Sequence, residues 1–65
     1  MSEFVVIDAE GRFLAERGFW VTASNDALVF ERVTWALAAA RRSGALCEVV
    51  EDFGVETQRT IETVG

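Results

Sequence analysis

Apolar residues in the first third of the chain come in short runs that are typical of β-strands. Residues 3–8 contain four consecutive β-prone side chains, and residues 12–15 and 19–22 contain shorter apolar groups. The polar segment 8–11 ends in Gly11, a residue that tolerates the positive φ of hairpin loops. The sequence therefore predicts a hairpin, and residues 19–22 either extend its second strand or start a short third one.

The middle of the chain has the periodicity of one amphipathic helix. Helix-capping residue types occupy positions 24–26, and Gly44 is a good C-terminal stop signal. One apolar stripe at helical spacing runs through the segment: Phe30, Val33, Leu37 and Ala40. We predict a helix near residues 28–43. The alternative that residues 28–30 form an extended link, with the helix starting near Glu31, stays open.

The last third predicts two more strands, at residues 45–52 and 55–63, joined by a turn at 52–54. In the final segment, three apolar or small positions alternate with four polar ones: Val55, Thr57 and Ile61 against Glu56, Gln58, Thr60 and Glu62. Residues 1–65 are thus expected to form a single small α+β domain. Its predicted architecture is an antiparallel sheet of three or four strands with one main helix packed on one face, in the order ββαββ.

Composition argues against most kinds of catalysis. The 65 residues include no histidine, and the one cysteine, Cys47, is in phase with Val49 on a predicted strand and is expected to be buried. The chain contains no P-loop, dinucleotide-binding, zinc-protease or paired-cysteine motif. The carboxylates near residues 8–10 and 25–26 do not match the spacing of a calcium-binding loop. We therefore predict a protein that is not an enzyme and that needs no cofactor or metal.

Charge is distributed unevenly along the chain. The net charge is −5, and most of the excess lies in residues 45–65, where five carboxylates accompany only Arg59. If the register of the last hairpin aligns them, strand alternation places four carboxylates on one side: Glu48, Asp52, Glu56 and Glu62. Such a face is either a solvated outer surface or an acidic patch that meets a basic groove of a partner protein.

One helix can cover only one face of the sheet, yet the predicted first hairpin is apolar on both faces. Either strand twist, with a bulge at Gly18, folds the second face inward, or this face binds a second copy of the chain or another protein. Phe19 and Trp20 are the candidate residues for such an apolar interface. Both a monomer and a homodimer are compatible with this pattern.

Residues 4–40 resemble a pattern common in short phage and mobile-element proteins, carried by FVVIDAEGRFLAERGFWV and NDALVFERVTWALAAA. In size, acidity and lack of catalytic motifs, the chain is also similar to anti-CRISPR proteins, several of which present carboxylates that imitate nucleic-acid phosphates. This resemblance implies a phage protein that acts as a DNA mimic and inhibits a partner such as a Cascade-type CRISPR complex, without binding nucleic acid itself. It assigns a role to no individual residue.

Two other functions fit the same sequence: a homodimeric structural or regulatory module that uses the apolar sheet face, and a small adaptor domain. No segment approaches the roughly 20 apolar residues of a membrane span, and the acidic start of the chain lacks the features of a signal peptide. With its lone thiol, the protein is expected in the cytoplasm, that of the host cell if it comes from a phage, and without a membrane partner.

Overall fold

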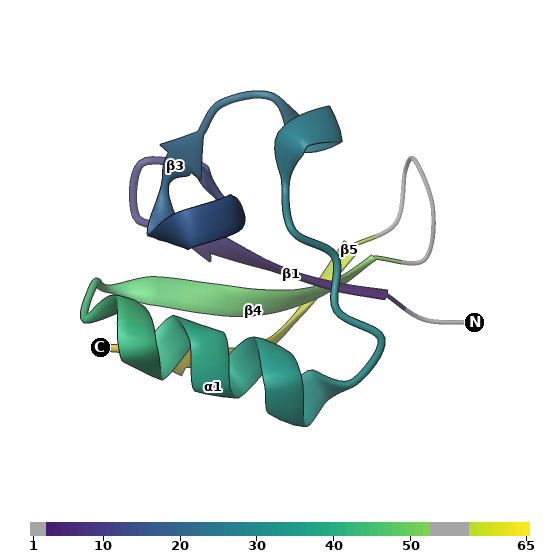
Figure 1. Ribbon diagram of the computed structural model, residues 1–65. Coiled ribbons are helices and arrows are strands. Elements are labelled where there is room, and N and C mark those ends of the chain that lie inside the picture. Colours follow the sequence, from purple (N-terminus) through teal and green to yellow (C-terminus); the bar gives the residue numbers. More distant parts are fainter. Residues whose placement is uncertain (1–2, 53–57) are drawn as a thin grey trace.

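The computed structural model describes residues 3–52 and 58–65 and consists of one antiparallel sheet with one helix against it (Figure 1). The strand order across the sheet is β3-β2-β1-β4-β5. The strands are β1 (Glu3–Asp8), β2 (Phe13–Leu14), β3 (Trp20–Val21), β4 (Cys47–Asp52) and β5 (Gln58–Val64). Helix α1 spans Val33–Ser43, and 3-10 turns at Glu16–Gly18 and Ser24–Asp26 lie on either side of β3.

The predicted α+β class, with one main helix on one face of an antiparallel sheet, is confirmed. The predicted number of three or four strands is wrong, because the sheet has five. The extra strand is β3, which pairs with β2 instead of extending it: Leu14 lies opposite Trp20, and Phe13 lies opposite Val21. The 3-10 turn before β3 reverses the chain, with both Arg17 and Gly18 at positive φ (61° and 80°).

Strand β1 lies at the centre of the sheet and joins its two halves. It pairs with β2 on one side and along its whole length with β4 on the other, so that Val6 lies opposite Val49 and Val5 opposite Val50. The continuous apolar run of β1 suits this position, because a central strand contacts neighbours on both sides. Partners more than forty residues apart in the sequence therefore form the middle of the protein.

Helix α1 begins five residues later than the predicted start. The segment before it is the extended link that the sequence left open, and Phe30 exchanges two backbone hydrogen bonds of 2.8 Å with Phe4. Gly44 ends the helix in the left-handed conformation (φ 71°), as predicted.

The predicted apolar stripe faces the core: Ala40 is buried, and Phe30, Val33 and Leu37 are half-buried and pack against the core. Ala36, which the stripe did not include, is also buried.

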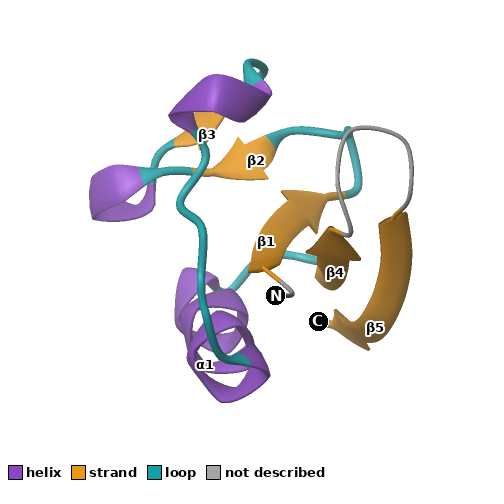
Figure 2. Ribbon diagram, turned by 90° about the vertical axis from the view of Figure 1, so that its right-hand side faces the viewer, coloured by secondary structure: helices purple, strands orange, loops and turns teal. Residues whose placement is uncertain are grey.

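The core lies between α1 and one face of the sheet (Figure 2). Its buried members come from four elements: Val6, Leu14, Ala36, Ala40, Cys47 and Val49. Since two alanines face the sheet, the helix backbone can approach the strands closely. Cys47 is buried as expected, and its Sγ lies 3.8 Å from the carbonyl oxygen of Ala40.

The turn between β1 and β2 is organised by the carboxylate of Asp8. Oδ1 accepts hydrogen bonds from the backbone N–H groups of Glu10 (2.9 Å) and Arg12 (2.8 Å), and Oδ2 accepts one from Nε of Arg12 (2.9 Å). Desolvation raises the pKa of Asp8, but these hydrogen bonds and the charge of Arg12 together outweigh it, so the pKa lies below its ordinary value. The predicted turn at 8–11 is therefore confirmed, with Gly11 at positive φ (81°).

Candidate protein-binding face

The sheet has a second face, away from α1, which we call the outer face. Residues that share a face of an antiparallel sheet follow from the register, because partners directly opposite each other point the same way. The strand pairing assigns these described residues to the outer face: Glu3, Val5, Ile7, Phe13, Val21, Glu48, Val50, Thr60 and Thr63. The core residues occupy the alternate positions.

The apolar middle of the outer face is largely covered within the protein itself. Val5 and Val50 are buried, and Ile7, Phe13 and Val21 are half-buried. Of the two alternatives that the sequence left open, this pattern favours the one in which the second face of the first hairpin is covered, because none of these residues is fully exposed. What the outer face offers to solvent is its rim, where the polar and charged residues lie.

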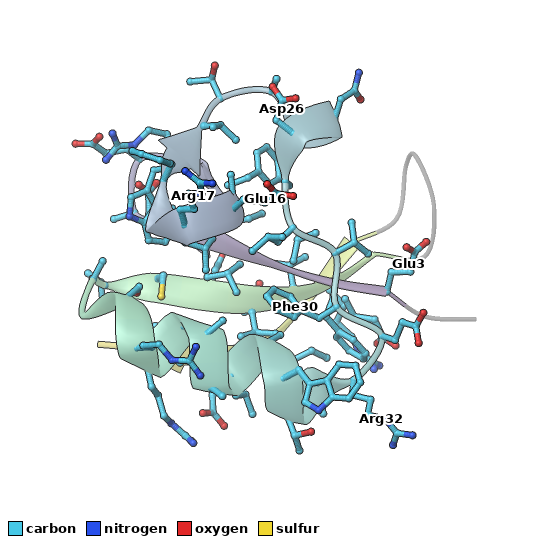
Figure 3. All side chains as sticks on the ribbon, in the orientation of Figure 1. Glu3, Glu16, Arg17, Asp26, Phe30 and Arg32 are labelled. Carbon is cyan, nitrogen blue, oxygen red and sulfur yellow. The ribbon has the colours of Figure 1, made fainter. Side chains whose placement is uncertain are left out.

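The arginines lie away from the outer face, whereas carboxylates occur on both faces of the sheet. Glu3 and Glu48 belong to the outer face, and the backbone of Asp52 lies directly opposite Glu3. None of the described outer-face positions is an arginine. On the other side, α1 and its N-cap hold Arg32, Arg41 and Arg42, and Arg32 extends from the end of the helix, 5.6 Å from the ring of Trp35 (Figure 3).

The remaining arginines also lie away from the outer face. Arg59 binds the buried carboxylate of Glu51 at 2.7 Å, on the helix side of the sheet. Arg12 and Arg17 belong to the turns that flank β2, and Arg12 is paired with Asp8 and Glu10. The described outer face therefore carries carboxylates and no arginine, whereas the helix side carries charges of both signs.

The predicted face of four carboxylates does not form as expected, and the reason is a bulge in β5. Glu48 lies opposite Thr63, whereas Glu62 lies opposite Val49 and so points to the helix side, where it pairs with Arg41 at 3.6 Å. Val49 and Val50 are consecutive, but their partners Glu62 and Thr60 are not. The extra residue, Ile61, breaks the two-residue alternation on which the prediction depended.

The other predicted site residues have different outcomes. Asp52 has the same strand parity as Glu48, so the backbone position of Asp52 lies on the predicted side. Glu56 lies outside the described residues. The two candidate interface aromatics are separated: Phe19 is 66% exposed, whereas Trp20 packs against the core. Trp20 is half-buried and therefore offers less surface to a partner than Phe19 does, and its role at an interface stays a prediction.

One end of the outer face is hollowed beside Glu48. The hollow has a volume of about 300 Å³, and the row of directly opposed residues Ile7, Glu48 and Thr63 crosses it. The other residues that line it are Leu46, which is 59% exposed, Ala9, Asp8 and Cys47. Sequence reasoning missed the lining residues other than Glu48, because pairing of β1 with β4 is needed to bring them together.

Glu48 is half-buried in this hollow without a positive partner. The hydroxyl of Thr60 donates a long hydrogen bond of 3.4 Å to its Oε2. In the part of the chain that the structure describes, no arginine pairs with Glu48, although Asp8, Glu10, Glu51 and Glu62 each have one. The arrangement leaves a carboxylate available to a cation from outside the protein.

The described residues contain neither a metal site nor a membrane-spanning helix. Across residues 3–52 and 58–65, no group of three or more cysteine or carboxylate side chains is placed to hold a metal ion. No helix within those ranges is both long and apolar enough to cross a membrane. Comparison with protein-family models, with curated proteins and with solved structures gave no match for this chain.

Proposed function

We propose that the protein is a non-catalytic inhibitor that binds a basic, nucleic-acid-binding surface of a partner protein through its outer face. The observation that carries this proposal is that the described outer face contains carboxylates and no arginine, and that no described arginine pairs with Glu48. Complementary charge raises association rates and selects partners. The resemblance to anti-CRISPR proteins makes a Cascade-type CRISPR complex the first partner to test.

The decisive experiment compares charge reversal on the two sides of the sheet. Glu48→Lys changes the outer face, and Glu62→Lys, on the neighbouring strand, changes the helix side by the same charge. We expect Glu48→Lys to weaken inhibition of DNA binding by a purified Cascade-type complex at least about tenfold, because it turns an attraction into a repulsion at the interface. Glu62→Lys should retain inhibition within about twofold.

Salt concentration supplies the second arm of this experiment. Raising the salt from 50 to 300 mM should slow association of the wild-type protein, because added ions screen charges on the scale of about 10 Å. Circular dichroism of both variants controls for folding. Inhibition that is insensitive to salt and survives Glu48→Lys would contradict the proposal. Absence of any effect on the CRISPR complex would remove that partner, and capture from a host lysate with both variants would then test the outer face itself.

A second candidate function, a homodimeric interaction module, is favoured by the exposure of Phe19. This side chain lines an open hollow of about 580 Å³ beside the 3-10 turns, with Val21, Ala27 and Leu28. Phe19→Ser should then convert a dimer into a monomer in sedimentation analysis, and the charge reversals should be silent. A wild-type protein that is monomeric at 100 µM would exclude this function.

A further inference from the structure

We infer that the hollow beside Glu48 is a recognition pocket for a single arginine side chain of the partner protein. The inference rests on the proposed function and adds to it the chemical identity of the group that is recognised. It depends on three features of the hollow: its size, its apolar lining residues and the lining carboxylate of Glu48, with which no described arginine pairs.

The size of the hollow suits one side chain. Its volume of about 300 Å³ lies at the lower limit of small-molecule pockets, which is about 300–1,000 Å³. It lies at the end of the sheet where β1 ends and β4 begins, and its lining residues Ala9, Leu46 and Thr63 are exposed, so a side chain can enter without any movement of the strands. A nucleic acid or an extended peptide backbone would contact the whole outer face instead.

The walls favour arginine over lysine. Ile7 and Leu46 offer apolar surface for a methylene stem, and the exposure of Leu46 (59%) means that a guest would bury it. A guanidinium group is planar and more weakly hydrated than an ammonium group, so it loses less on entering an apolar hollow. Its paired N–H donors also match both oxygens of one carboxylate.

The electrostatic setting points to the same group. Glu48 accepts only the 3.4 Å hydrogen bond from Thr60, which leaves most of its acceptor capacity unused. The next outer-face carboxylate by register, Glu3, is separated from Glu48 by the buried pair Val5 and Val50.

Asp8 also lines the hollow, but its carboxylate is already bound by Arg12 and by the backbone N–H groups of Glu10 and Arg12. Glu48 is therefore the lining carboxylate that no described arginine pairs with, and the hollow is suited to one positive group.

The experiment uses the full chain and two small probes, N-acetyl-arginine amide and N-acetyl-lysine amide. We expect the arginine probe to shift the backbone NMR signals of Ile7, Glu48 and Thr63 with a saturable, millimolar dissociation constant, at least about fivefold tighter than the lysine probe. Glu48→Gln should abolish saturation, and the matched Glu62→Gln should not change it. Non-saturable shifts, or equal affinities for the two probes, would overturn the inference.

A pocket-filling variant separates this inference from the proposed function. Thr63→Phe adds an aromatic ring to the hollow, suits an exposed β-strand position, and leaves every carboxylate in place. If arginine recognition anchors the complex, this variant loses both the arginine probe and partner binding. Retained partner binding with loss of the probe would overturn arginine recognition but leave the charged outer face as the binding surface. Partner binding that also survives Glu48→Lys would overturn both.

Discussion

The two faces of this small sheet are built from neighbouring residues but differ in what covers them and in how their carboxylates are paired. On the helix side, Val6 and Val49 are fully buried. Glu51 and Glu62 form ion pairs with Arg59 and Arg41 on the same side. On the outer face, Val5 and Val50 are buried without a helix above them, and Glu48 is left unpaired. The carboxylates of Glu51 and Glu62 on the helix side are thus paired with arginines, whereas no described arginine pairs with Glu48 on the outer face.

The contrast shows how a 65-residue chain can combine a buried core with a half-buried carboxylate that no described arginine pairs with. A chain of this size rarely has more than about 3–5 kcal/mol of stability, so its core cannot tolerate a misplaced polar group. The helix side therefore carries most of the stability, and changes at the rim of the outer face should affect binding more than folding.

The largest effect should come from a charge placed under the helix. Ala36→Asp puts a carboxylate at a fully buried position, at a cost of several kcal/mol, and should leave the protein unfolded at 25 °C. Ala38→Asp, on the exposed side of α1, is the matched control and should cost less than about 1 kcal/mol. Leu37→Asp should lie between the two, because Leu37 is half-buried. Thermal unfolding followed by circular dichroism measures all three.

A folded Ala36→Asp protein with a normal melting temperature would show that the helix does not pack through Ala36, and the assignment of the two faces would have to be reversed.

A smaller loss of stability should distinguish substitutions at two adjacent valines, Val49 and Val50. Val49→Ala removes two carbon atoms from beneath α1 and should cost about 2 kcal/mol from lost burial and the cavity left behind. Val50→Ala removes the same atoms from the outer face, where no helix holds the cavity open, and should cost about half as much. Urea unfolding of both variants gives the comparison. Equal losses would mean that both faces are packed alike.

The smallest effect concerns the turn at Asp8 and appears as a dependence on pH. Because folding lowers the pKa of Asp8, its contribution to stability is complete above the unfolded value, near 3.8, and is lost as the pH falls through the lower folded value. The stability difference between wild type and Asp8→Asn should therefore be constant at neutral pH and shrink below about pH 4. Melting temperatures between pH 7 and pH 2.5 test this, and a difference that grows on acidification would contradict it.

Much of the architecture was predictable because it depends on local patterns. The run of β1 and the stop at Gly44 were each visible in a few consecutive residues, and both are confirmed. The turn at Asp8 was also visible, since acidic, small and glycine residues follow one another there. By contrast, the sequence left the start of α1 open, because the spacing of Phe30 also suits a helix. In the structure, the backbone of Phe30 is extended and pairs with that of Phe4, twenty-six positions earlier.

The candidate site was only partly predictable. Glu48 was selected from its charge and its strand parity, and the strand pairing places it on the outer face, whereas its role in binding stays a prediction. Glu62 was assigned to the same face because strict alternation was assumed along the last strand. The bulge at Ile61 shifts Glu62 to the helix side, and nothing in the local sequence marks this bulge, since neither glycine nor proline occurs there.

The sequence by itself determined the class of fold, the positions of most strands, the end of the helix and the burial of Cys47. These features follow from side-chain periodicity and backbone preference, which act over a few residues. Only the tertiary structure decided that β1 pairs with β4, that Trp20 faces the core, and that Ile7, Glu48 and Thr63 share a hollow. These features depend on the register between distant strands, and a shift of one residue in that register exchanges the two faces of a sheet.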